Sequence, residues 1–324
     1  MSHLFSRCTS ITSINIPNFY TPRAKYLDAM FAFCYSLETL SGEHFGSSAQ
    51  TVTLQYMFFG CKKMTTLLLD EWVTYNVESM QYMFYDCNLL TSLLLGNFDF
   101  SKVKYMNQMF EGCSSLSSID LSFFNTENVE NMSHMFTRCS SLTSLNLSKF
   151  NTKNVKIMDA MFSFCHSLKT INFSNNFITN NVVQMQYMFY ECYSLTSIDL
   201  SSFNTQMVTN MGQMFEKCTS LKMLNLPNFK STNLEDTSYM FKSCNSLSYI
   251  NLSNFGDNKI SNMKEMFYFC NNLNYLDISS LNINNNVQTS IFNDLPSSGT
   301  IRVNKNLINR IRGQIPSGWK IETF

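Results

Sequence analysis

The apolar positions of this chain follow a single pattern that repeats from end to end. In residues 129–139 they fall at i, i+3, i+6, i+7 and i+10, which is the spacing of the buried stripe of a short helix. Asn125 and Asn128 stand just before this stripe, where their side-chain oxygens can cap free amide groups. The pattern therefore predicts a short helix in each repeat.

The spacing changes after Cys139. Leu142, Leu145 and Leu147 read L-x-x-L-x-L, and the last two alternate with polar residues as in a short strand. Phe150 then closes the unit. Because one unit of helix, turn, strand and loop cannot bury its own apolar face, we expect the units to stack with parallel strands roughly 5 Å apart.

The cysteines define the period of the repeat. All eleven stand at the same place, three positions after a phenylalanine, and the step from each to the next is nearly constant. They are Cys8, Cys34, Cys61, Cys87, Cys113, Cys139, Cys165, Cys192, Cys218, Cys244 and Cys270, and each coil is numbered here by its cysteine. A period of about 20–29 residues is typical of leucine-rich repeats. The sequence predicts an α/β solenoid, a leucine-rich-repeat-like right-handed stack of ~26-residue helix–strand coils with a C-terminal cap.

The unbroken repeat predicts one elongated solenoid domain of eleven coils over residues 1–290. Residues 291–324 form a degenerate last coil and a C-terminal cap, with a strand at 300–303, a short helix at 307–312 and a last strand at 319–321. Such a cap would cover the last parallel edge of the stack. The steps that end at Cys61 and Cys192 are each longer than the others by a single residue, which predicts small loop insertions near residues 47–51 and 175–177.

One position departs from ordinary leucine-rich repeats. Where an asparagine or cysteine usually follows L-x-L, this chain has an aromatic residue, as at Phe124 and Phe150. The asparagine ladder that ties neighbouring loops together is therefore missing at that place.

Composition and charge exclude several classes of function. The chain has 23 basic and 23 acidic residues, so it lacks the basic footprint of a nucleic-acid binder. No apolar run is long enough for a membrane span. The four histidines lie in different coils without a repeat-built nucleophile, and there is no glycine-rich phosphate loop and no C-x-x-C pair. We therefore expect no enzyme activity, no catalytic residues, no metal site and no cofactor.

The cysteines themselves have a structural interpretation. They are odd in number, and stacked equivalent side chains point the same way rather than at one another. We expect buried free thiols that act as small apolar fillers of the core.

The outward face of the predicted strands carries two polar rows. One consists of hydroxyl residues, and the other consists of Asp120, Asn146, Asn172, Asp199, Asn225, Asn251 and Asp277. This face could be a flat surface for protein or glycan, or a solubilised sheet face with hydrogen bonds between coils. The uniform pattern favours the second interpretation.

Coils 3 and 4 carry extra apolar side chains outside the buried positions. The candidates for partner binding are Tyr56, Phe59, Tyr82, Tyr85, Leu68 and Leu94. Stacking predicts Tyr56 beside Tyr82 and Phe59 beside Tyr85, and exposed aromatic clusters favour contacts with other proteins. The alternative is that these rings pack beneath the insertion in coil 2.

The full motif, M-x-x-M-F-x-x-C-x-x-L-x-x-L-x-L-x-x-F-x-T-x-N-V, resembles the BspA-like family of leucine-rich repeat surface proteins. Residues 125–129, 132–136 and 139–142 carry the likeness, which covers nearly the whole chain. The resemblance implies a non-enzymatic module for protein recognition or adhesion at a microbial cell surface, with a host or neighbouring-cell protein as partner. It supplies no residue-level binding motif.

The start of the chain leaves an alternative open. Residues 1–8 align with residues 132–139, so the chain begins inside a repeat without a signal peptide or a capping unit. This favours a fragment of a longer surface or secreted protein. The alternative is a cytoplasmic scaffold, or a structural subunit of a larger assembly, that associates through its uncapped N-terminal coil.

Overall fold

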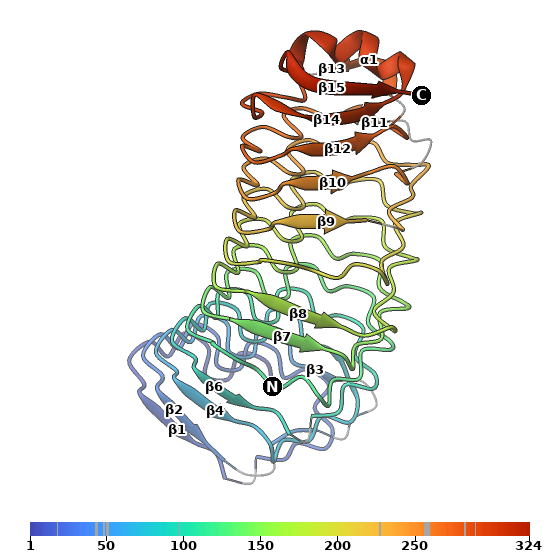
Figure 1. Cartoon of the computed structure of the whole chain (residues 1–324). Coiled ribbons are helices and arrows are strands. Elements are labelled where there is room, and N and C mark those ends of the chain that lie inside the picture. Colours follow the sequence, from blue (N-terminus) through green and yellow to red (C-terminus); the bar gives the residue numbers. More distant parts are fainter. Residues whose placement is uncertain are drawn as a thin grey trace.

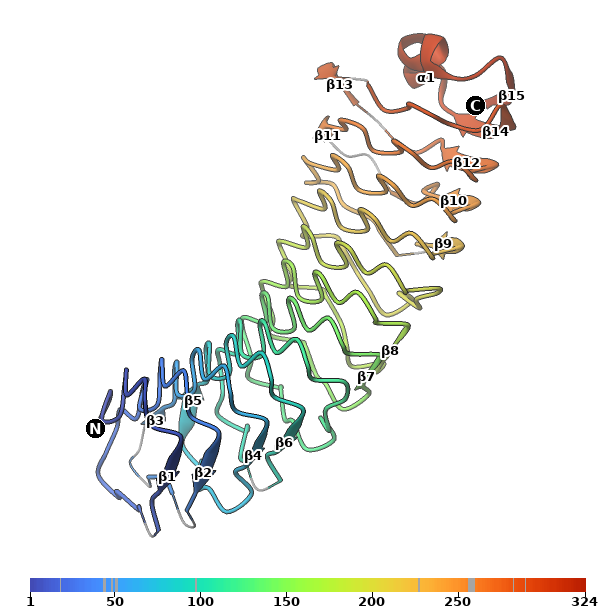
Figure 2. The ribbon, with the colours of Figure 1, turned by 90° about the vertical axis from the view of Figure 1, so that its left-hand side faces the viewer.

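The computed structural model is an elongated β-solenoid in which each repeat forms one coil (Figure 1). It describes residues 1–17, 19–42, 45–47, 49, 52–96, 98–226, 228–255, 260–281, 283–288 and 290–324. The two termini lie at opposite ends of the stack, which bends along its length (Figure 2). Of the predicted insertions, the first includes Ser48, Gln50 and Thr51, which lie outside the described residues.

The strands are short, and the paired ones are parallel. On the side of the L-x-L motif lie β1 (Ser13–Asn15), β2 (Thr39–Ser41), β4 (Thr66–Leu68), β6 (Ser92–Leu94), β7 (Ser144–Leu147), β8 (Thr170–Phe173), β9 (Met223–Asn225), β10 (Tyr249–Asn251), β12 (Tyr275–Ile278), β14 (Ser298–Val303) and β15 (Gly318–Thr323). The others are β3 (Val52–Thr53), β5 (Val77–Ser79), β11 (Ile260–Asn262) and β13 (Ile283–Gln288). The strand predicted from L-x-L is thus confirmed, as in β7, except in coils 5 and 8, where the described residues form no strand.

The helices predicted in each coil are wrong. The one α-helix among the described residues is α1 (Lys305–Ile311), which is followed by the 3-10 helix η1 (Arg312–Gln314). The M-x-x-M-F-x-x-C segments instead form consecutive turns. Cys139 N donates to Phe136 O (3.1 Å), three positions back, whereas Phe136 N donates to Met161 O of the next coil (2.9 Å). Amides that a helix would use internally therefore hold neighbouring coils together.

Two backbone positions in each segment explain why no helix forms. The third and seventh residues of M-x-x-M-F-x-x-C adopt positive φ, as at His134 (56°) and Arg138 (61°). For residues other than glycine, left-handed backbone costs about 1–2 kcal/mol and interrupts a right-handed helix. The hydrogen bonds to the next coil offset this cost. Glycine takes the seventh position in coils 3 and 5, at Gly60 and Gly112.

The two sides of the coil are joined to different degrees. On the turn side, β-bridges link every coil to the next from Ser79 to Asn262. On the L-x-L side, residues 118–121 and 197–200 form no strand, so the described sheet is broken at coils 5 and 8. The interior between the two sides holds the core.

Stacked columns of equivalent side chains fill the core. One column of phenylalanines runs from Phe5 to Phe292, and Phe136 lies 5.5 Å from Phe110 and 6.0 Å from Phe162 between ring centroids. Each cysteine from Cys34 to Cys270 is buried and free, and its Sγ donates to a phenylalanine carbonyl of the preceding coil. The expectation of buried free thiols is confirmed for these ten, while Cys8 is half-buried.

A threonine ladder ties the loops where the asparagine ladder is missing. Thr179 is fully buried, and its Oγ1 donates to Asn204 O (2.6 Å) and accepts from Asn204 N (2.8 Å). Thr126 makes the same pair of bonds with Asn151. In the coil after that of Thr179 the ladder ends, because buried Thr205 Oγ1 has no partner among the described residues.

This difference gives a matched pair of substitutions. Thr179→Val should lower the free energy of unfolding by about 1–3 kcal/mol, because it leaves the partly buried backbone amide of Asn204 without its acceptor. Thr205→Val should cost less than about 0.5 kcal/mol or stabilise the protein, since the hydroxyl that it removes is unpaired. Urea unfolding followed by circular dichroism measures both, and equal losses would contradict the assignment of the ladder.

The C-terminal segment continues the sheet. The predicted strands and helix at 300–303, 319–321 and 307–312 are present as β14, β15 and α1, and β14 pairs with β12 in register. Leu307, Ile308 and Ile311 of α1 join the core at the end of the stack. Asn304 caps α1 by accepting from Leu307 N (2.8 Å). We retain 1–290 as solenoid and 291–324 as last coil and cap as our proposed division.

Candidate functional site

The turn side presents side chains from the third, sixth and seventh positions of M-x-x-M-F-x-x-C. We call this surface the turn face. In coil 4 these positions are Tyr82, Tyr85 and Asp86, and positive φ at the third and seventh positions recurs in the described coils. Because equivalent residues stack, side chains that are one repeat apart in the sequence become neighbours on this face.

An aromatic patch, defined as Tyr56, Phe59, Tyr82 and Tyr85, covers coils 3 and 4. Tyr56 and Tyr82 stack with centroids 4.6 Å apart and planes within 9°, and Phe59 and Tyr85 stack at 4.5 Å and 3°. The predicted neighbour pairs are therefore confirmed. Phe33 extends the patch into coil 2, 5.0 Å from Phe59.

Leu68 and Leu94 do not join this patch. They are paired neighbours in β4 and β6, and they are 57% and 44% exposed. Figure 2 shows β4 and β6 on the opposite side of the coil from β3 and β5, which lead into the tyrosines. The six candidate residues thus form two separate surfaces.

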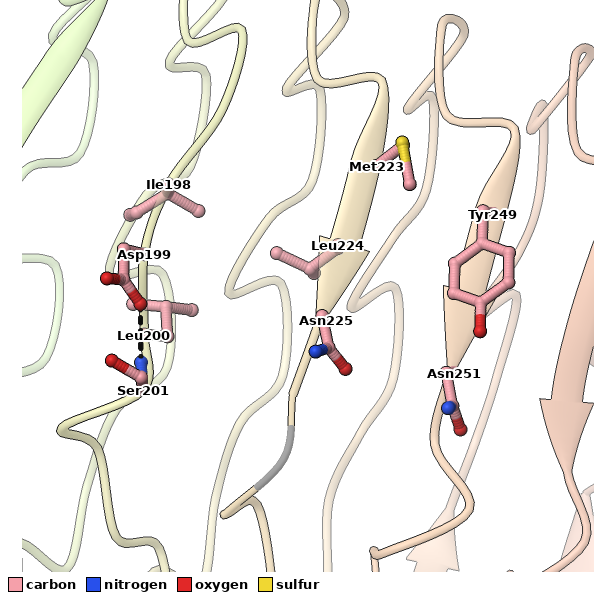
Figure 3. Close-up of a pocket in the computed structure, with 9 residues that line it drawn as sticks. All are labelled: Ile198, Asp199, Leu200, Ser201, Met223, Leu224, Asn225, Tyr249 and Asn251. Carbon is pink, nitrogen blue, oxygen red and sulfur yellow. Dashed lines mark hydrogen bonds between the residues drawn. The ribbon is translucent and has the colours of Figure 1, made fainter.

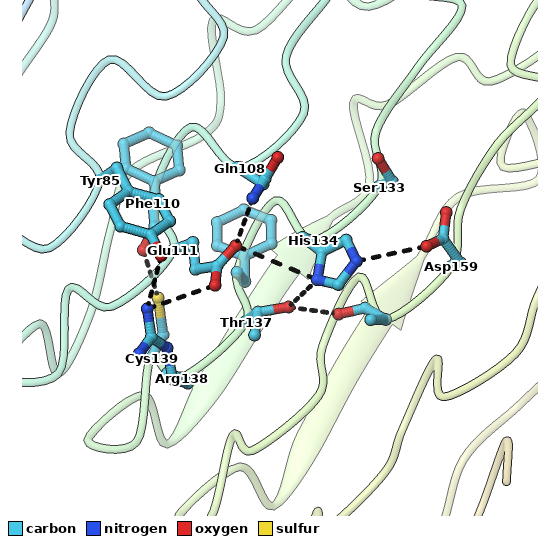
Figure 4. A network of polar contacts seen from close by, with 12 residues as sticks. Tyr85, Gln108, Phe110, Glu111, Ser133, His134, Thr137, Arg138, Cys139 and Asp159 are labelled. Atoms are coloured by element: carbon cyan, nitrogen blue, oxygen red, sulfur yellow. Dashed lines mark hydrogen bonds and ion pairs between the residues drawn. The ribbon is translucent and has the colours of Figure 1, made fainter. Parts of the chain in front are cut away.

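A charged network adjoins the aromatic patch (Figure 4). One Nη of Arg138 lies 3.0 Å from Asp86 Oδ1 and 3.3 Å from Glu111 Oε1, and donates to the Tyr85 hydroxyl at 3.2 Å. Arg138 reaches back two coils because Gly112, between them, has no side chain. A Cβ there would lie 2.3 Å from Asp86 Oδ1.

His134 completes this network. Its Nε2 lies 3.3 Å from Asp159 Oδ2, and its Nδ1 lies 3.3 Å from Thr137 Oγ1. The hydrogen bond to Asp159 raises the pKa of the imidazole above its ordinary value, although partial burial opposes this. Thr137 is buried and donates to Ala160 O (2.6 Å), so this Asp–His–Thr group lacks an accessible nucleophile.

The raised pKa of His134 predicts a pH-dependent contribution to stability. A folded-state pKa above the unfolded one gives stabilisation that is full below the unfolded pKa and is lost as pH rises through the folded pKa. His134→Gln should therefore destabilise the protein more at pH 5 than at pH 8. Urea unfolding of both proteins at the two pH values measures this, with His3→Gln as a control. A loss of equal size at both values would contradict it.

A similar network recurs in coils 8 and 9. Lys217 pairs with Glu191 and lies 5.4 Å from the ring centroid of Tyr190, as Arg138 lies over Tyr85. Sequence reasoning missed both networks. The sequence does contain a signal for them. Opposite charges stand one or two periods apart at the seventh position of M-x-x-M-F-x-x-C.

Two of the hollows in the surface lie on opposite faces of the coils. One of about 420 Å³ on the turn face lies between Tyr85, Arg138, Phe164 and Tyr187. Another, of about 560 Å³, lies over coils 8 to 10 on the outward side of the L-x-L segments, which we call the strand face. In the part of the chain that the structure describes, no three His, Cys, Asp or Glu side chains come together as a metal site. Within the described residues, no helix has the length and apolar character needed to cross a membrane.

Family comparisons agree with this architecture. The family described as "Mycoplasma protein of unknown function, DUF285" matches residues 52–176, 167–281 and 224–298. The chain belongs to this family. The first 100 residues of this DUF285 protein also match the BspA type leucine-rich repeat region, in six copies, which confirms the resemblance seen in the sequence. No curated protein matches the chain.

The solved structures to which the DUF285 chain is similar include leucine-rich repeat proteins and a vaccine antigen. A leucine-rich repeat protein from Bacteroides ovatus shares 19% identity, with 100% of this chain and 86% of the other covered, at a TM-score of 0.36. The pneumococcal vaccine antigen PcpA shares 14% identity over 96% and 67%, at 0.48. A leucine-rich repeat protein of Leptospira interrogans shares 15% over 90% and 79%, at 0.28.

Proposed function

We propose that this chain is a non-enzymatic protein-recognition module, and that the aromatic patch of coils 3 and 4 is its contact surface. The supporting observation is the pair of stacked ring columns, Tyr56 on Tyr82 and Phe59 on Tyr85, at the surface. Stacking fixes the rings before binding, so little side-chain entropy is lost on contact. Tyrosine beside arginine is a frequent composition of binding hot spots, and Arg138 lies over Tyr85.

The setting that we propose is a microbial cell surface, where the partner is a host or neighbouring-cell protein. The support is the match to the BspA type of leucine-rich repeat. The alternative is a cytoplasmic scaffold or structural subunit. Surface biotinylation of intact cells of the source organism separates the two, since only a surface protein is labelled before lysis.

A binding experiment tests the contact surface. The purified chain is passed over immobilised fibronectin, fibrinogen and collagen, beside a Tyr56→Ser/Tyr82→Ser/Tyr85→Ser variant. Loss of the stacked rings should weaken binding at least tenfold, because hot-spot aromatics contribute about 2 kcal/mol or more. Phe269→Ser is the control, since Phe269 is 39% exposed on the turn face and lies in coil 11, seven coils from the patch.

Two results would overturn this assignment. If binding is equal in the triple variant and the native chain, the patch is not the contact surface. If light scattering shows an oligomer that the triple variant abolishes, the patch joins copies of this chain, which favours the structural alternative.

A further inference from the structure

The strand face carries a hollow that the aromatic patch does not explain. It measures about 560 Å³ and lies across coils 8 to 10 (Figure 3). Asp199, Asn225 and Asn251 follow one another along one row, and Met223 and Tyr249 follow along the next. Its size is within the range of small-ligand sites in proteins.

The hollow exists because the sheet is interrupted at coil 8. Residues 197–200 form no strand, and β9 pairs with β10 alone among the described strands. Ile198 is partly exposed, whereas Leu224 and Ile250, at the equivalent position of the two following coils, are buried. The strand face is therefore open at this place rather than closed by a continuous ladder.

The polar row behaves differently inside and outside the hollow. In coils 6 and 7, Asn172 Nδ2 donates to Asn146 Oδ1 (3.3 Å), so the amides satisfy each other. The bond from the amide two residues on is the same in both places: Asn146 Oδ1 accepts from Ser148 N (3.1 Å), and Asn251 Oδ1 in the hollow accepts from Ser253 N (2.9 Å). No bond joins the described side chains of Asn225 and Asn251. Their amide groups remain available as donors at the surface, which a merely solubilised sheet face does not require.

The lining identifies the chemistry of a ligand. Amides and one carboxylate recur once per coil, and the spacing between paired strands, roughly 5 Å, is about the length of one pyranose unit. Such groups both donate to and accept from hydroxyls. Tyr249, stacked on Tyr275 at 4.8 Å, and Met223, 63% exposed, give an apolar wall for the C–H face of a sugar. No cationic side chain is among the described residues that line the hollow, so acidic groups have no partner there.

We propose that this hollow binds a neutral linear polysaccharide that lies along the solenoid axis, with one sugar unit per coil. Asp199, Asn225 and Asn251 bond successive hydroxyls, and Tyr249 packs against a ring face. The surface is separate from the aromatic patch, so this proposal does not depend on the proposed protein contact.

Oligosaccharides of defined length test the proposal. The probes are cellobiose to cellohexaose and chitobiose to chitohexaose, titrated by calorimetry, with hyaluronan as an acidic comparison. At least one neutral series should bind, with affinity rising to about three or four units and then constant, because the row spans three coils. Hyaluronan should bind more weakly than the neutral chains.

Matched variants locate the binding. Asn225→Ala/Asn251→Ala and Tyr249→Ala should each weaken binding about tenfold, whereas Asn146→Ala/Asn172→Ala, in the same row outside the hollow, should leave it unchanged. Circular dichroism confirms that each variant is folded. The proposal is overturned if neither series binds, if the control pair weakens binding as much as the hollow variants, or if hyaluronan binds best.

Discussion

Phe136→Ala should lower the free energy of unfolding by about 3–5 kcal/mol, which is the usual cost of removing a large buried aromatic side chain. The ring of Phe136 is fully buried between Phe110 and Phe162 in the central column. The coil cannot collapse onto the cavity, because both the amide and the carbonyl of Phe136 are bonded to the next coil. Its amide donates to Met161 O, and its carbonyl accepts from Cys165 Sγ (3.1 Å).

Urea unfolding followed by circular dichroism measures this loss. Each coil of a solenoid contacts only its neighbours. In Phe136→Ala the two halves of the stack should therefore begin to unfold separately. Phe269→Ala is the matched control, since that ring is 39% exposed on the turn face, and it should cost much less. A loss below about 1 kcal/mol in Phe136→Ala would mean that the phenylalanine column does not carry the core.

The repeat period makes neighbours predictable. The regular recurrence of the motif places Tyr82 on Tyr56 and Tyr85 on Phe59 without any knowledge of the coil's backbone, and the rings do stack. The strand at Leu145 and Leu147 follows from the same repetition, because alternate burial needs only the two-residue period. Stacking, burial and the identity of the core were therefore accessible from the sequence.

The helix was not excluded by the sequence, because apolar residues three and four apart suit consecutive turns as well as a helix. What separates the two is the positive φ at residues such as His134 and Arg138, and these are not glycines. The sequence thus lacked the usual signal of left-handed backbone. The hydrogen bonds that stabilise this conformation form between stacked coils. They cannot be deduced from the sequence of one repeat alone.

The breaks in the strand face were also hidden in a uniform pattern. Asp120 and Asp199 occupy the outward row in the two coils that lack a strand, yet Asp277 lies in β12. Asp277 is buried and lies 3.1 Å from Arg302 Nη1 of the next coil, so its charge is compensated there. An aspartate without such a partner disfavours a parallel strand, which fits the absence of a strand in coils 5 and 8.

Thiol labelling of the native chain should modify Cys8 at least a hundredfold faster than the other ten cysteines. The thiolate is the reactive form, and burial raises the pKa of each thiol in the middle of the stack, that of Cys165 to about 12. At pH 8 a thiol with that pKa is about one part in ten thousand thiolate, and its sulfur is also closed to the reagent. Cys8 is the half-buried exception.

Labelling with iodoacetamide at pH 8, followed by peptide mass spectrometry, resolves each site. In urea all eleven cysteines should react at similar rates, which shows that the fold gives the protection. Cys8→Ser should remove the fast native phase and leave the rest unchanged. Fast native labelling of Cys139 or Cys165 would instead mean that the central coils open readily. A stack whose buried thiols remain inaccessible to the reagent is rigid enough to hold its surface side chains at fixed spacing. Recognition along the coils requires this property.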